Sequence, residues 1–238
     1  MRFMGTGWAG FLVVLLAALL PSGKSPPAAQ DRITHFPLSS ANSAQHFELV
    51  NAEKAEVVTY RGRQATTLIP SPGHEKESAL AILPGTDFKD GTIEVEIAGF
   101  PRPTAAPDDR GFIGIAFRVQ EHGSRYECFY IRPTNGRADD QLRRNHSLQY
   151  VSEPEYPWER LRKENPGVYE SYADLELGAW TNIKIVVSGV KAQMFVNGAS
   201  QPSLIVNDLK LGETSGAIAL WSYNTTDAHF SNVKITRK

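Results

Sequence analysis

The stretch "RYECFYIRP", residues 125–133, places chemically useful side chains at alternate positions. Alternate side chains of a β-strand share a face. One face of this strand would therefore be aromatic and polar, with Tyr126, Cys128, Tyr130 and Arg132. Phe129 and Ile131 would point the other way, into a core. Aromatic rings that stack on sugar C–H surfaces, beside polar groups that fix hydroxyls, suit a carbohydrate ligand.

Three carboxylates are candidates for acid, base or nucleophile. Glu94 and Glu96 share a face of "GTIEVEIAGF", and two carboxylates beside a sugar can hydrolyse a glycosidic bond. The alternative is a solvated strand face. Glu127 falls on the core side of its strand, where it would reach solvent at the strand end or pair with Arg125 or Arg110.

A second group combines guanidinium, amide, imidazole and phenol side chains. Its members are Arg118, Arg132, Arg143, Arg144, Asn145, His146, Gln149 and Tyr150. Arg143 or Arg144 could hold a carboxylate or sulfate through two parallel hydrogen bonds, and His146 and Tyr150 could transfer protons, as in a lyase. The alternative is a structural ion-pair network. Trp158 would serve as a stacking platform or lid, or would anchor a long loop.

Short alternating segments must position these side chains. The runs "GFIGIAFRV", "WTNIKIVV" and "VKAQMFV" alternate apolar and small or polar residues, and Asn197-Gly198 is typical of a hairpin turn. The pattern predicts an all-β fold, an antiparallel two-sheet jelly-roll sandwich. Residues 133–179 interrupt it and are expected to form one long loop insertion with a short helix in "YPWERLRKENPG".

The N-terminal residues 1–29 read as a signal peptide, with Arg2 before the apolar run "WAGFLVVLLAALL". The alternative is an uncleaved anchor. Residues 30–238 would then form the domain, secreted or periplasmic, monomeric and free of the membrane after cleavage. The formal net charge of −1 offers no basic field for nucleic acid.

Metal and cofactor signals are weak. The six histidines show no zinc spacing, and we expect no cofactor. Asp87, Asp90 and Asp227 could together hold a structural Ca²⁺. The alternative is that they are ordinary aspartates of turns and bind no metal. The single cysteine, Cys128, cannot form an intramolecular disulfide, and is either a small buried strand residue or a reactive thiol.

The series "DGTIEVEI", "GFIGIAFRV", "YECFYI", "LGAWTNIKIVV", "FVNG", "SGAIALW" and "HFSNVKI" resembles the concanavalin A-like lectin/glucanase superfamily, over residues 36–235. Within it, the pattern is similar to laminin-G-like and 3-keto-disaccharide hydrolase domains. Tyr126 and Glu127 match the Tyr-Glu-x-Gln strand of the hydrolase-like domains, with Phe129 at the glutamine position. The resemblance implies a curved sandwich with a glycan site on its concave sheet.

Three functions therefore stand as predictions. The first is an exported domain that binds a glycan in a concave polar and aromatic groove. The second is a glycoside hydrolase or lyase, 3-keto-disaccharide hydrolase-like, acting on oligo- or polysaccharide. The third is a laminin-G-like protein-binding module.

Overall fold

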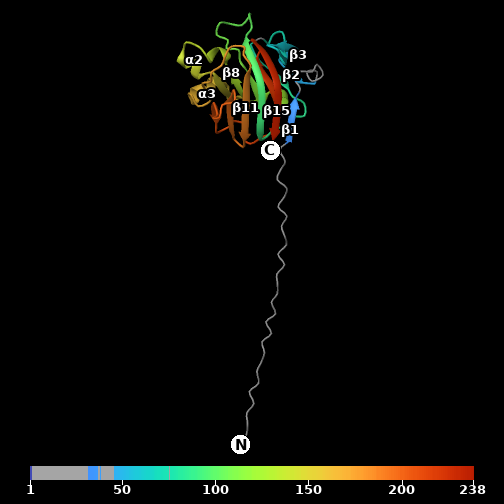
Figure 1. Ribbon diagram of the computed structural model, residues 1–238, viewed down its shortest axis with the longest axis vertical. Helices are drawn as coiled ribbons and strands as arrows, with labels where there is room; N and C mark the ends of the chain where they lie inside the picture. The colour runs from blue at the N-terminus through green and yellow to red at the C-terminus, as the bar shows by residue number, and fades with distance from the viewer. Residues whose placement is uncertain (2–31, 37, 39–45, 75) are drawn as a thin grey trace.

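The computed structural model describes residues 1, 32–36, 38, 46–74 and 76–238 (Figure 1). The expected signal peptide, residues 1–29, lies outside the described residues except for Met1. Within the part of the chain that is described, no helix has the length and apolar character needed to cross a membrane.

Two antiparallel sheets make up the fold. Sheet A has eight strands, in the order β13 (Leu204–Val206), β12 (Lys191–Val196), β11 (Thr181–Ser188), β6 (Gly91–Pro101), β15 (Thr226–Arg237), β4 (Arg63–Pro70) and β3 (Ala52–Tyr60), with β1 (Arg32–Phe36) also paired to β15. Sheet B has seven, in the order β10 (Glu170–Ser171), β9 (Leu148–Glu153), β8 (Arg125–Ile131), β7 (Ile113–Gln120), β14 (Ala217–Tyr223), β5 (Ser78–Ile82) and β2 (Glu48–Val50). The predicted all-β sandwich is confirmed.

Alternation explains why the sheets pack against each other. In β6, Ile93, Val95 and Ile97 are buried, while the glutamates between them are half-buried. The buried residues join one hydrophobic core with Ile115 and Phe129 of sheet B. The period-two pattern thus turns one face of each sheet toward the other.

The predicted hairpins form where the backbone can turn. Asn197 and Gly198 have φ values of 51° and 73° and begin the connection from β12 to β13, which covers residues 197–203 and is longer than the expected two-residue turn. Arg61 and Gly62, at 43° and 77°, connect β3 to β4. Positive φ at both central positions matches the right-handed twist of the flanking strands.

The insertion, residues 133–179, is more ordered than a loop with one helix. It contains η2 (Pro133–Asn135), α2 (Gln141–Asn145), α3 (Trp158–Glu164) and the strands β9 and β10, which extend sheet B. The expected helix is α3, which begins after Pro157. The unpredicted α2 is a single turn capped by Asp140, whose side chain accepts from the Arg143 amide at 2.8 Å, and one turn is too short to show a helical period. Figure 1 shows both helices at one side of the sandwich, opposite β2 and β3.

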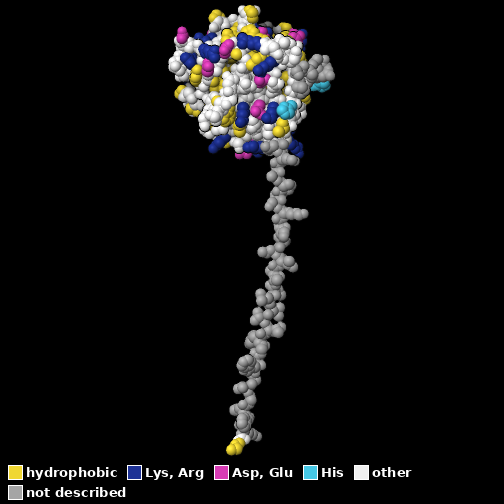
Figure 2. Space-filling model, in the orientation of Figure 1, with side chains coloured by type: hydrophobic (Ala, Val, Ile, Leu, Met, Phe, Trp, Pro, Cys, Tyr) yellow, Lys and Arg dark blue, Asp and Glu magenta, His cyan; other side chains and the backbone are white. Residues whose placement is uncertain are grey.

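Sheet B is buried on both faces. Every residue of β7 from Ile113 to Val119, and of β8 from Tyr126 to Ile131, is buried. The expected open trough along β8 is therefore wrong, because the insertion packs over the outer face there. The face of the molecule seen in Figure 2 carries Lys and Arg interspersed with Asp and Glu, as the low net charge suggests.

Candidate functional site

A pocket of about 680 Å³ lies between the outer face of sheet B and the insertion, and we call it the insertion pocket. Its floor includes Tyr130 of β8 and Trp221 of β14, whose rings stack at 4.8 Å with 22° between their planes. The other lining residues are Ser78, Asp108, Asp109, Arg110, Phe112, Arg132, Asn135, Arg143, His146, Val151, Glu153, Pro157, Trp158, Glu159, Arg162 and Tyr223.

Arg132 lies at the end of β8 and is only 4% exposed. Its guanidinium donates to the Tyr130 hydroxyl, to Gln149 Oε1 and to the His146 carbonyl, each at 3.0 Å. Gln149 in turn donates to the carbonyls of Tyr150 and Tyr169. Gln149 therefore lies under the pocket, where it orients Arg132 and would not itself reach a ligand.

The carboxylate of Glu170 joins the insertion to the floor. It accepts two hydrogen bonds from Arg162 of α3, with one Nε–Oε2 distance of 3.0 Å, and lies 3.5 Å from Arg132 Nη1. His146 Nε2 is also 3.5 Å from this carboxylate. Burial lowers the pKa of His146, and Arg162 and Arg132 act in the same direction, while Glu170 opposes them. A neutral imidazole is thus favoured at this wall.

Trp158 provides an aromatic side chain at the pocket that is 37% exposed. It opens α3, and the Arg162 guanidinium lies over its ring at 4.5 Å. The Arg132 guanidinium is 5.9 Å from the same ring. A flat ring edged by fixed donors is the usual composition of a sugar subsite.

Arg143 and Arg144 take different places although they are neighbours in sequence. Arg143 lines the insertion pocket. Arg144 lies outside it, over the Tyr172 ring at 5.0 Å, and donates to the Tyr172 hydroxyl at 2.9 Å. Only Arg143 is therefore placed to meet a ligand there.

The expectation that Arg118 lies beside Tyr130 is wrong. The pairing of β7 with β8 shifts between Phe117 and Gln120, and Arg118 adopts a φ of 52°. This bulge turns the side chain away from the outer face, and Arg118 is fully buried. Its guanidinium donates to backbone carbonyls of three turns, those of Lys89 (2.9 Å), Gly189 (2.7 Å) and Gly212 (2.5 Å).

Glu127 and Tyr150 also lie away from the pocket, on the core side of sheet B. The Tyr150 hydroxyl donates to Glu127 Oε2, and the Leu211 amide donates to Glu127 Oε1 at 2.7 Å. The Lys210 amide donates to the Tyr150 hydroxyl at 2.8 Å. Burial raises the pKa of both side chains. The pair fastens residues 208–212 to the sheet, so a catalytic role in the insertion pocket is excluded by position.

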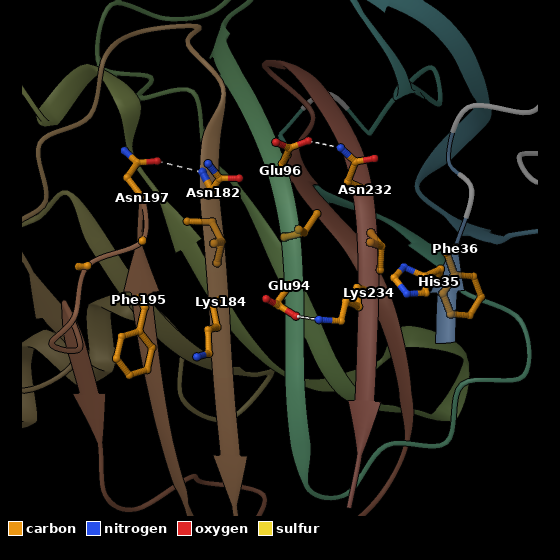
Figure 3. A pocket seen from close by; sticks show the side chains of 15 residues that line it. His35, Phe36, Glu94, Glu96, Asn182, Lys184, Phe195, Asn197, Asn232 and Lys234 are labelled. Carbon is orange, nitrogen blue, oxygen red and sulfur yellow. Dashed lines mark hydrogen bonds and ion pairs between the residues drawn. The ribbon is translucent and has the colours of Figure 1, made fainter. Parts of the chain in front are cut away.

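Glu94 and Glu96 line a separate groove of about 1000 Å³ on the outer face of sheet A, the sheet-A groove. Figure 3 shows Glu94 directed at Lys234, 2.7 Å away, and Glu96 at Asn232. Arg63 also donates to Glu96, at 2.5 Å. These carboxylates already have partners on their own sheet and lie away from His146. They form the solvated strand face that was the alternative.

Tyr126 contacts the floor of the insertion pocket through Trp221. It is buried, and its hydroxyl accepts a hydrogen bond from the Trp221 indole at 3.2 Å without lining the pocket. Cys128 is free and fully buried on the same face, paired with Ala116 and Val151. Of the five residues expected to be catalytic, only His146 reaches the insertion pocket.

Several lining residues were not singled out from the sequence. Phe112 and Trp221 follow the alternation of their strands, so the same rule that placed Tyr130 could have found them. Glu153 and Arg110 lie at strand ends and in a connection, where no periodic pattern applies. The Glu153 side chain has no hydrogen-bond or ion-pair partner among the described residues. Burial raises the pKa of Glu153, and the charges of Glu159 and Glu155 raise it further.

The three aspartates proposed for Ca²⁺ do not converge. Asp90 precedes the start of β6 and accepts from the Gly189 amide at 2.7 Å, whereas Asp227 pairs with Phe100 near the other end of β6. No group of three or more His, Cys, Asp or Glu side chains could hold a metal ion in the part of the chain that the structure describes.

Comparison with known proteins gives the fold. No family model and no curated protein matches the sequence. Solved structures that match include a protein of unknown function with a galectin-like fold from Bacillus subtilis, at 11% identity and a TM-score of 0.57 over 86% of this chain and 96% of that one.

Two further solved structures also match this chain. One is the carbohydrate-binding module CBM66 from Bacillus subtilis, at 12% identity and a TM-score of 0.51, over 79% of this chain and 95% of that one. The other is domain 4 of AbnA, a GH43 extracellular arabinanase from Geobacillus stearothermophilus in complex with arabinotriose, at 10% identity and a TM-score of 0.50, over 87% and 93%. The chain therefore has the β-sandwich fold of these domains, in agreement with the antiparallel two-sheet sandwich expected from its sequence.

Proposed function

We propose that this chain is an exported carbohydrate-binding β-sandwich domain and that the insertion pocket holds the glycan. The observation that carries the proposal is the composition of that pocket: a half-open Trp158 beside Arg143 and His146, over the stacked rings of Tyr130 and Trp221. A pocket of about 680 Å³ is large enough for one or a few sugar units.

Two further observations support the proposal. The fold is shared with a carbohydrate-binding module and with a domain in complex with arabinotriose. The pocket is also pre-formed, because Arg132 and Arg162 are already held by Glu170. A pre-formed pocket spares the ligand the cost of ordering its own site. Export rests on the N-terminal signal-like sequence, residues 1–29.

A glycan array followed by calorimetry tests the proposal, with Trp158→Ala as the variant. Loss of the indole should weaken binding at least ~10-fold, since buried or stacked aromatics dominate small-ligand sites. Tyr172→Ala is the matched control. Tyr172 is a 39% exposed aromatic residue of the insertion with the Arg144 guanidinium over its ring, but it lies outside the pocket. It should bind within about twofold of the native protein.

The proposal fails if no glycan binds, or if Trp158→Ala binds as well as the native chain. Capture of a protein through loops, without glycan binding, would favour the laminin-G-like module instead. That result would leave the insertion pocket without a role in recognition.

A second candidate, a glycoside hydrolase or lyase of the 3-keto-disaccharide hydrolase type, is favoured by one observation. Glu153 and His146 are ionisable groups in the same pocket, and the pKa of Glu153 is raised. A carboxyl group with a raised pKa is what a glycosidase uses as general acid. Products would appear in the same incubations, and Glu153→Gln should stop their release while binding persists. Intact glycan after prolonged incubation would exclude this activity.

A further inference from the structure

The charges of the insertion pocket are unevenly compensated. Four guanidinium groups line it, those of Arg110, Arg132, Arg143 and Arg162. Glu170 compensates two of them, since it binds Arg162 through two hydrogen bonds and lies 3.5 Å from Arg132. Arg110 and Arg143 are left without an ion-pair partner among the described residues.

Arg143 is the least satisfied of the four. Its side chain makes no hydrogen bond or ion pair within the described part of the chain, and its Nε is closed off from water. A guanidinium has five N–H donors and no acceptor, so a half-buried one without partners is ready to receive an anion. The donors that other arginines spend on the protein remain available here.

Arg110 lies close enough to Arg143 to feel its charge. Burial lowers the pKa of Arg110, and the Arg143 charge lowers it further. Arg110 donates only to the carbonyls of Pro107, at 3.2 Å, and Asp109, at 3.1 Å. The Asp109 carboxylate is itself engaged by the Ala106 amide at 2.8 Å and the Thr225 hydroxyl at 2.9 Å. Two like charges held together in a partly dry site are stabilised by an anion between them.

Among the carboxylates that line the pocket, Asp108 and Asp109 lie near Arg110, where their charges oppose the lowering of its pKa, and Glu153 is the one that lies apart from the arginine pair. Besides burial, the charges that raise the pKa of Glu153 come from Glu159 and Glu155, and no arginine offsets them. Asp108 is exposed. The pocket thus has a basic end at Arg110 and Arg143 and an acidic end at Glu153. A ligand that matches both would carry an anionic group on one side and hydroxyl donors on the other.

We infer that the insertion pocket selects an acidic sugar, one with a carboxylate or sulfate ester that Arg143 and Arg110 bind, while Glu153 accepts hydrogen bonds from hydroxyl groups. The inference rests on the proposed function and narrows its ligand class. Guanidinium forks match both anions, so the protein chemistry is the same for a uronic acid and for a sulfated sugar.

An array of uronic-acid and sulfated oligosaccharides, each printed beside its carboxyl-reduced or desulfated counterpart, tests the inference and separates the two anions. The acidic member of a pair should bind ~10- to 100-fold more tightly, the range for a charge-assisted hydrogen-bond pair. Its affinity should fall as salt rises from about 0.05 to 0.5 M, since salt screens the attraction.

Arg143→Gln should remove most of the preference for the acidic member while leaving the thermal midpoint unchanged, because the side chain has no hydrogen-bond or ion-pair partner among the described residues. Arg144→Gln is the matched control. It removes the adjacent arginine, which lies outside the pocket on Tyr172, and should keep the preference.

If both members of each pair bind equally, and Trp158→Ala still abolishes that binding, the inference is overturned and the proposed function stands. If Arg143→Gln keeps the acidic preference, the inference is also overturned. If no oligosaccharide binds, the proposed function and the inference fail together.

Discussion

At the scale of single residues, burial decides which polar groups can act on a ligand. Glu127 and Tyr150 are types that often do chemistry, yet both spend their hydrogen bonds on each other and on the amides of Leu211 and Lys210. His146 and Glu153 have more ordinary sequence surroundings but border a cavity. Access therefore separates the candidate site from the structural polar groups more clearly than residue type does.

The buried Glu127 carboxyl gives a pH-dependent stability. Burial raises its pKa above the unfolded value of about 4.5, so the folded state holds the proton more tightly than the unfolded chain. This tighter proton binding stabilises the folded state. The stabilisation is fully present below about pH 4.5 and is lost as the pH rises through the folded pKa of Glu127. The free energy of unfolding should therefore fall relative to Glu127→Gln, by up to about 1.4 kcal/mol per pH unit in that interval.

Urea unfolding of both proteins between about pH 4 and pH 8 measures the difference. Glu121→Gln, which removes a carboxylate whose side chain is 64% exposed, controls for the loss of one surface charge. A difference between native protein and Glu127→Gln that stays constant over this range would contradict the assignment.

At the scale of elements, one carboxylate links the insertion to the floor of the pocket. Glu170 of β10 meets Arg162 from α3 and Arg132 from the end of β8. The pairing of β10 with β9 is only two residues long, so backbone hydrogen bonds alone hold little of this segment. The ion pairs of Glu170 therefore help, together with the buried Leu161 of α3, to keep Trp158 over the floor of the pocket.

Glu170→Gln should loosen the insertion. The substitution keeps the shape of the side chain but leaves the buried Arg132 without its counter-charge, which costs about 3 kcal/mol. Hydrogen exchange of α3 and β10 should speed up while that of β6 stays slow. Glu164→Gln, which breaks the exposed Arg160 pair of α3, should change stability by less than about 0.5 kcal/mol. Equal exchange in both variants would show that Glu170 does not hold the insertion.

The elements also show what the sequence could predict. Regular alternation placed Tyr130 and Ile93 on the correct faces, because a strand without irregularity keeps its period of two. The same rule placed Arg118 on the wrong face, because an extra residue in a bulge changes the face on which the neighbouring side chains lie. No residue in "AFRVQ" indicates the bulge. The insertion was predicted as a loop because its helices are one or two turns long. Arg110 and Glu153 became candidates only when chain segments far apart in sequence met at the pocket.

At the scale of the whole molecule, the two outer faces have different characters. The sheet-A groove is wide, and its two glutamates have partners, Lys234 for Glu94 (Figure 3) and Arg63 for Glu96. The insertion pocket on the opposite sheet keeps unpaired arginine and glutamate. Recognition is therefore expected from the sheet-B side, where desolvated groups still need a partner.

The single thiol reports on the integrity of the whole sandwich. Cys128 is fully buried, and burial raises its pKa well above the usual value, so the reactive thiolate is scarce. The native protein should not react with 5,5′-dithiobis(2-nitrobenzoate), and one thiol per chain should react after unfolding in urea. It should also remain a monomer without reductant. Rapid reaction of the native protein would mean that the strands around Cys128 open locally.

The bulge at Arg118 has a consequence for how the chain reaches its final form during synthesis. The carbonyls that accept hydrogen bonds from this guanidinium come from Lys89, Gly189 and Gly212, so the last of them leaves the ribosome 94 residues after the arginine itself. Until then only the Lys89 carbonyl and the Asp90 carboxylate, which both precede Arg118 in the chain, are available to the guanidinium, and water must complete its solvation. Closure of that end of the two layers must wait for the final third of the polypeptide.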